Sequence, residues 1–120
     1  MSTRSFIGIV NPDGSVSGVY CHYDGYLEGV GALLRQHYNT PEIVRDLLAL
    51  GDISSLGPTL DSSDFYHRDR KEEMSVPFKY ASLELGNTSE QVGFEFWYVF
   101  SPKGWLWRDR NSQWKPLTDV

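Results

Sequence analysis

The hydrophobic positions of this chain change period twice, which divides the sequence into three parts. Residues 5–10 and 15–23 are rich in branched and aromatic side chains, and the second run alternates between its two faces, as β-strands do. Residues 11–14 (Asn-Pro-Asp-Gly) have a turn composition, because proline presets φ and glycine accepts a positive φ. The first part is therefore predicted to be a β-hairpin.

A helical period follows this hairpin. Apolar residues at helical spacing predict a first short helix; they are Leu27, Val30, Leu33, Leu34 and Tyr38. Gly29 and Gly31 weaken the start of that helix, which suggests that close packing requires them. Thr40 as N-cap and Pro41 at the first helical position begin a second helix, which Gly51 ends. The two helices are expected to cover one face of a sheet.

The strand pattern returns in the last third of the chain. Strands are predicted over residues 78–85, 92–100, 105–108 and 114–117, with a turn at 86–89. Before them, residues 57–77 form a long loop of a length that is typical of functional or mobile segments. The fold class is therefore α+β over residues 1–120 as a single domain: an N-terminal β-hairpin, a helical hairpin, and an antiparallel, aromatic-rich β-meander.

Composition and charge narrow the classes of function. The 120 residues carry a formal net charge of −5 and a pI of about 5.0, which argues against free nucleic acid as the partner. A single cysteine, Cys21, makes no internal disulfide, and we interpret it as a buried structural residue. No apolar run approaches the roughly 20 residues that span a bilayer, and no targeting segment is recognised, so we expect a cytoplasmic protein without membrane partners.

Two His-x-Asp pairs are candidates for chemistry: His22 with Asp24, and His67 with Asp69. In an extended chain, positions i and i+2 share a face, so each pair could orient an imidazole as a base or supply metal ligands. The alternative is structural, with Asp24 in an Asp-Gly turn and His22 half-buried. The motifs of common enzymes and cofactor sites are absent from the sequence, so no catalytic residue, cofactor or metal is predicted.

Arginine triplets and aromatic rings are the other candidate binding groups. Arg68 and Arg70 flank Asp69, and arginine forks clasp carboxylates or phosphates, although such triplets are more often solvated turns. In the meander, alternation predicts that Phe94, Phe96, Tyr98 and Phe100 share one face. Exposed rings there would form a partner-binding patch, for which the candidates are Trp97, Trp105 and Trp107.

Several motifs resemble a family of small proteins encoded by phages, prophages and mobile elements. They are Thr-Arg-Ser-x-Ile-Gly at residues 3–8, Tyr-Cys-His-x-Asp-Gly-Tyr at 20–26, Leu-Gly-Asp-Ile-Ser-x-Leu at 50–56, and Arg-Asp-Arg at 68–70. The motif residues of this family correspond here to Arg4, Tyr20, His22, Asp24, Tyr26, Arg68 and Asp69. With His67 and Arg70 they make up the candidate functional cluster.

The resemblance implies a phage accessory protein that acts in the cytoplasm of a bacterial host. The first functional hypothesis is a non-catalytic inhibitor, similar to anti-CRISPR proteins, that binds a protein component of a host defence system. The second is a small-molecule site, either a nucleotide-binding sponge or a hydrolase, built on the two His-x-Asp pairs. The second hypothesis predicts that residues 61–73 fold over residues 19–26, with a pocket between them. The oligomeric state is left open.

Overall fold

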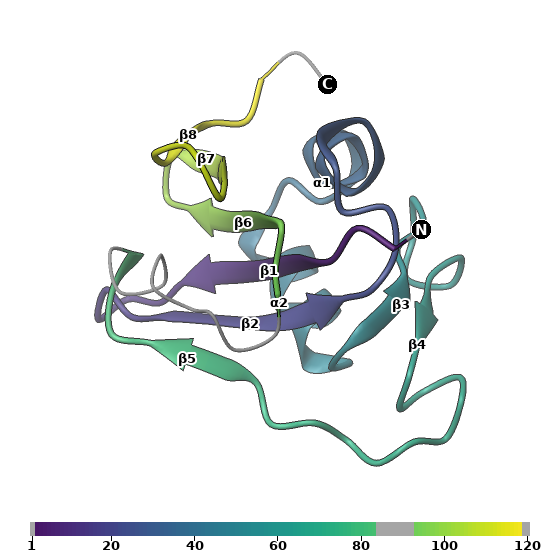
Figure 1. Cartoon of the computed structure of the whole chain (residues 1–120). Helices are drawn as coiled ribbons and strands as arrows, with labels where there is room; N and C mark the ends of the chain where they lie inside the picture. Colours follow the sequence, from purple (N-terminus) through teal and green to yellow (C-terminus); the bar gives the residue numbers. More distant parts are fainter. Residues whose placement is uncertain (1, 84–92, 119–120) are drawn as a thin grey trace.

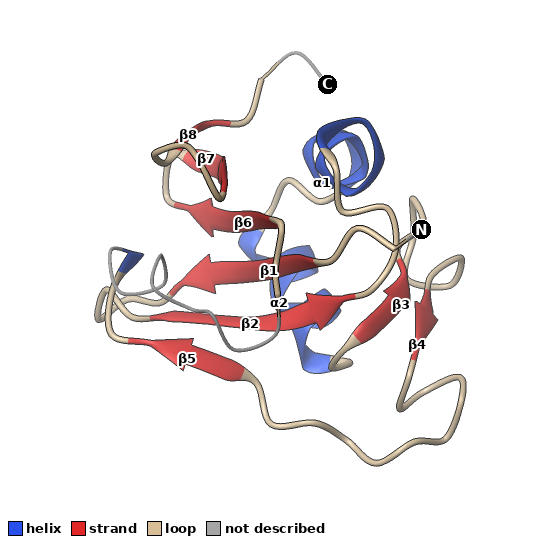
Figure 2. Ribbon diagram, in the orientation of Figure 1, coloured by secondary structure: helices blue, strands red, loops and turns tan. Residues whose placement is uncertain are grey.

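The protein folds as a mixed β-sheet with short helices packed on one face, as the ribbon drawings show (Figures 1 and 2). The computed structural model describes residues 2–83 and 93–118. The elements in chain order are β1 (Ser5–Val10), β2 (Val16–Cys21), the π-helical turn η1 (Leu27–Gly31), α1 (Ala32–His37), α2 (Pro41–Ala49), β3 (Ile53–Ser55), β4 (Asp64–Phe65), β5 (Phe78–Tyr80), β6 (Phe96–Ser101), β7 (Gly104–Asp109) and β8 (Lys115–Pro116). No helix in these two ranges is long and apolar enough to cross a membrane.

The α+β class, the N-terminal hairpin and the antiparallel C-terminal strands agree with the sequence prediction. The sheet as a whole is mixed, however, because β1 pairs in parallel with β6 and β2 pairs in parallel with β3. The strand order is β4-β3-β2-β1-β6-β7-β8, and β5 pairs with β2 rather than joining the meander. Hydrophobic alternation defines which face of a strand is buried, but it contains no information about the neighbouring strand or its direction.

Apolar side chains cover both faces of this sheet. Ile7, Val19 and Cys21 pack against the helices on one face. Phe6 and Val16 belong to a second cluster on the opposite face, where Phe94 closes over Phe6 at a ring-centroid distance of 5.7 Å. The strands β1 and β2 are therefore central strands, buried on both sides.

The helices begin and end largely where local sequence predicts. The Thr40 hydroxyl accepts a hydrogen bond of 3.2 Å from the Ile43 N–H, and Pro41 occupies the first turn of α2. The first helix differs, since its first five residues form a π-helical turn. A Cβ at Gly29 would lie 2.3 Å from the Asp24 carbonyl oxygen, so the close packing expected for this glycine is present.

Two predictions for the second half of the chain are wrong, one about the face on which Phe94 lies and one about the loop at 57–77. Phe94 does not share a face with Phe96, Tyr98 and Phe100, because it precedes β6 and packs in the opposite cluster. The loop at 57–77 is not structureless, since β4 lies within it and pairs with β3. The predicted turn at 86–89, and the parts of the predicted strands that cover residues 84–85 and 92, lie outside the described residues.

Candidate functional site

Tyr20 is the centre of the polar cluster on the sheet face opposite the helices. Its backbone N–H donates a 3.0 Å hydrogen bond to the carboxylate of Asp52, which ties β2 to the chain just before β3. Its hydroxyl is hydrogen-bonded to Nδ1 of His22. Burial raises the pKa of the Tyr20 hydroxyl, and the nearby Arg4 guanidinium opposes that rise. Arg4, Tyr20 and His22 are therefore brought together, as the candidate cluster requires.

Asp24 and Tyr26 lie in the turn that follows β2. Asp24 has a positive φ of 59°, and its carbonyl oxygen accepts a 2.8 Å hydrogen bond from the Val30 N–H. The Gly25 N–H donates to the carbonyl of Thr3, and the Tyr26 hydroxyl lies 3.4 Å from the Asp24 carboxylate. These contacts favour the structural interpretation of Asp24, in which it shapes the turn before η1.

The second His-x-Asp pair also has local partners. The Asp69 carboxylate accepts a 2.8 Å hydrogen bond from the Phe65 N–H and forms a 2.9 Å ion pair with Arg68. Hydrogen bonds from Arg68 and from the Phe65 N–H hold the pKa of Asp69 below its ordinary value. Nδ1 of His67 lies 2.8 Å from the carbonyl oxygen of Glu72.

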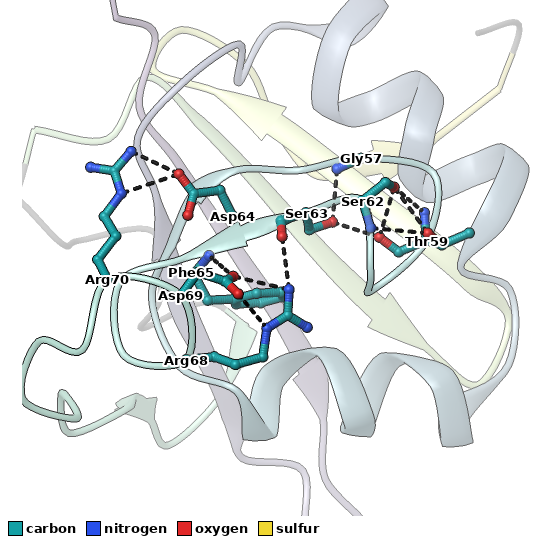
Figure 3. A network of polar contacts seen from close by, with 9 residues as sticks. All are labelled: Gly57, Thr59, Ser62, Ser63, Asp64, Phe65, Arg68, Asp69 and Arg70. Carbon is teal, nitrogen blue, oxygen red and sulfur yellow. Dashed lines mark hydrogen bonds and ion pairs between the residues drawn. The ribbon is translucent and has the colours of Figure 1, made fainter.

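Both arginines of the triplet also brace this loop. Arg68 donates to the Ser63 carbonyl, and Arg70 donates to the carboxylate of Asp64 (Figure 3). Arg70 also donates to the hydroxyl of Ser54 in β3. Nε and one terminal nitrogen of each guanidinium are engaged in these contacts, which favours the interpretation of the triplet as a turn with internal ion pairs.

A surface depression of about 240 Å³ lies between β2 and this loop, and we call it the acidic depression. It is lined by Tyr20, Asp52, Tyr66, His67, Glu72, Glu73 and Ser75. The predicted meeting of residues 61–73 with residues 19–26 therefore occurs, and Tyr20 and His67 line one site. Asp24 and Asp69 are not part of the lining, so the two His-x-Asp pairs do not combine into one constellation.

The charge of the acidic depression follows from its lining. Among the described residues, the lining combines Asp52, Glu72 and Glu73 with Tyr20, Tyr66 and His67, and it includes no lysine or arginine. Two cations close to lining residues also have other partners: Arg70 lies over the Tyr66 ring at 5.2 Å and is paired with Asp64, and Arg4 lies beside Tyr20. Carboxylates and ring faces both attract cations.

Five residues of the lining were not predicted as site residues from the sequence: Asp52, Tyr66, Glu72, Glu73 and Ser75. The consecutive Glu72 and Glu73, which follow a string rich in histidine and arginine, were a visible sign of a charged site. Nothing in the local sequence indicates that they lie close to β2. Within the described residues no group of three or more His, Cys, Asp or Glu side chains is arranged to hold a metal ion.

The tryptophans are not an exposed partner-binding patch, and this prediction is wrong for Trp97 and Trp105. Both are buried, and the Trp105 indole N–H donates a 2.7 Å hydrogen bond to the Tyr38 carbonyl. Trp107 stacks on Phe96 and receives the Lys115 ammonium at 4.3 Å from its ring centroid. The more exposed rings are Tyr23 and Tyr26, beside the turn that follows β2.

Cys21 is fully buried, and burial raises the pKa of its thiol to about 12. It therefore carries no nucleophilic chemistry at neutral pH.

No family model, curated protein or solved structure matches this chain.

Proposed function

We propose that this protein is a non-catalytic binding protein whose acidic depression receives a lysine or arginine side chain of a partner protein. The observation that carries the proposal is the lining of this depression, which combines Asp52, Glu72 and Glu73 with the rings of Tyr20, Tyr66 and His67. A guanidinium or ammonium group in such a site gains charge-assisted hydrogen bonds and cation–π contacts.

The size of the acidic depression favours a single side chain over a nucleotide. Sites that enclose drug-sized ligands have volumes of roughly 300–1,000 Å³, whereas this depression has about 240 Å³. The phosphates of a nucleotide would also lie beside three acidic residues, with no lysine or arginine among the described residues of the lining.

The partner class follows from charge and from the family resemblance. A net charge of −5 suits association with a basic protein surface. Defence proteins that bind nucleic acid have basic surfaces rich in lysine and arginine. The resemblance to phage and mobile-element proteins supports a bacterial defence component as the partner, with the protein acting as an anti-CRISPR-like inhibitor in the host cytoplasm.

The proposal is tested first on the site and then on the biology. Methylguanidinium, titrated into isotopically labelled protein, should shift the amide signals of Asp52, Tyr66 and Glu72, and acetate should not. A variant with Glu72→Gln and Glu73→Gln should weaken this binding, whereas Glu42→Gln with Asp46→Asn, which removes two exposed acids from α2, should not.

In the biological test, the same variants are expressed in bacteria that carry a CRISPR system, and these bacteria are infected with phage. Wild type and the α2 control should protect the phage, and the Glu72/Glu73 variant should protect it less. If wild type gives phage no advantage and captures no defence component, the inhibitor proposal is wrong.

A second candidate function is the binding or hydrolysis of a small molecule. It is favoured by one observation, the placement of the Tyr20 hydroxyl between the His22 imidazole and the Arg4 guanidinium. A thermal-shift screen of nucleotides on wild type and on Arg4→Gln separates the two candidates, because only this second function predicts stabilisation that depends on Arg4.

A further inference from the structure

A second concave site lies at the other end of the central strands, and we call it the apolar groove. It has a volume of about 420 Å³, within the range of roughly 300–1,000 Å³ that small-molecule sites occupy. It opens where the parallel strands β1 and β6 end, between the turn at residues 11–14, the start of α2 and the turn after β6. The site is therefore distinct from the acidic depression, which is lined from β2 by Tyr20, the partner of Phe6 near the opposite end of β1.

The walls of the apolar groove are hydrophobic and stiff. Ile9 and Phe100, which face each other in the parallel register, are almost fully buried and form its floor. Pro12, Pro41 and Pro102 stand at its exposed rim, one from each of the three bordering segments. Proline has a fixed φ, so little conformational entropy is lost when a ligand contacts this rim.

Among the described residues that line the apolar groove, Arg45 is the one charged side chain. It is exposed on α2, and the described part of the chain offers it no hydrogen bond or ion pair. The closest acid in the neighbouring turn, Asp13, already accepts hydrogen bonds from the N–H and hydroxyl of Ser15. Glu42 and Asp46 flank Arg45 on α2 but do not belong to the lining.

We propose that the apolar groove binds an apolar carboxylate, with its hydrocarbon part on Ile9 and Phe100 and its carboxylate on the Arg45 guanidinium. An arginine guanidinium pairs with a carboxylate through two parallel hydrogen bonds, which fixes the orientation of the ligand and adds to its affinity. The apolar floor explains why a hydrocarbon body is needed, and the lone cation explains why the head group is an anion. The charge of this ligand is opposite to that of the cation proposed for the acidic depression.

The test uses octanoate as the probe and octylammonium as its matched opposite, each titrated into the isotopically labelled full chain and followed by amide chemical shifts. Octanoate should shift Ile9, Val10, Phe100 and Arg45 in one saturable process, and octylammonium should bind at least about fivefold more weakly. Arg45→Gln should weaken octanoate by about fivefold or more, and Arg45→Glu should reverse the preference between the two probes. Lys79→Gln, which removes an exposed cation from β5, should change neither affinity.

Two results overturn the proposal. One is octanoate binding that stays unchanged in Arg45→Gln, because the head group would then have no specific partner. The other is a set of shifts that does not saturate, or that maps away from Ile9 and Phe100, because the probe would then contact the surface at random. Both results leave the acidic depression untouched, and the methylguanidinium titration is the independent measure of that site.

Discussion

At the scale of single residues, the reactive-looking side chains divide into those used by the fold and those available to a partner. Asp24, Arg68, Asp69 and Arg70 have partners inside the turn after β2 or inside the loop that includes β4. Glu72 and Glu73 instead belong to the lining of the acidic depression. The residue pattern alone did not separate these two groups, because an ion pair and a free charge look the same in sequence.

Cys21 should be unreactive in the native state. It is buried beneath the helices, and its pKa of about 12 leaves almost no thiolate at neutral pH. Labelling with a thiol reagent in native buffer is expected to be slower than in strong urea by about a thousandfold or more. Rapid native labelling would mean that the thiol is accessible and that the structural interpretation of Cys21 is wrong.

Asp69 should make the stability of the protein depend on pH in the acid range. Its folded-state pKa is lower than its unfolded value, so its contribution is present above about pH 4 and is lost as the pH falls through the folded pKa. Asp69→Asn should therefore reduce the free energy of unfolding at neutral pH and have less effect in acid. Urea unfolding at both pH values measures this, with Asp46→Asn on α2 as the control; equal effects of Asp69→Asn at both would contradict it.

At the scale of elements, local signals were most reliable where the hydrogen bonds of a short segment are made within that segment. The hairpin turn at residues 11–14 and the Thr40-Pro41 start of α2 formed as predicted. The π-helical η1 did not follow from helical periodicity, since the Asp24 carbonyl and the Tyr98 ring both lie against its glycines. An element whose geometry depends on distant residues is poorly predicted from its own sequence.

The N-cap of α2 gives an element-scale prediction. Thr40→Ala removes the side-chain acceptor of the Ile43 N–H and should lower the free energy of unfolding by about 1 kcal/mol. Thr40→Ser retains an acceptor and should stay close to wild type. Chemical denaturation of the three proteins measures the difference, and an alanine variant as stable as the serine variant would show that the cap contributes nothing.

At the scale of the whole molecule, long-range polar contacts join the C-terminal strands to the N-terminal half. The Tyr98 hydroxyl on β6 donates a buried 2.7 Å hydrogen bond to the Gly25 carbonyl, and Trp105 on β7 does the same for Tyr38 at the end of α1. The Tyr98 contact holds the turn after β2 against the sheet, and the Trp105 contact holds the end of α1. That turn follows the strand that supplies Tyr20.

Tyr98→Phe should therefore destabilise the protein as a whole. It leaves the buried Gly25 carbonyl without its donor, which is expected to cost about 1–3 kcal/mol in the free energy of unfolding. Tyr26→Phe removes an exposed hydroxyl from the same turn and should change stability by less than about 0.5 kcal/mol. Equal losses in the two variants, measured by urea denaturation, would contradict this role for Tyr98.

The sequence by itself determined the α+β class, the first hairpin, the cap of α2 and the negative charge, because each depends on neighbouring residues or on composition. The meeting of residues 61–73 with residues 19–26 was a prediction of the small-molecule hypothesis and did not follow from the sequence pattern itself. Only the tertiary structure decided that β6 lies parallel to β1, that Trp97 and Trp105 are buried, and that Asp52, Glu72 and Glu73 join Tyr20 in one depression. These outcomes depend on contacts between segments far apart in the chain, and alternation within a segment does not encode its partner.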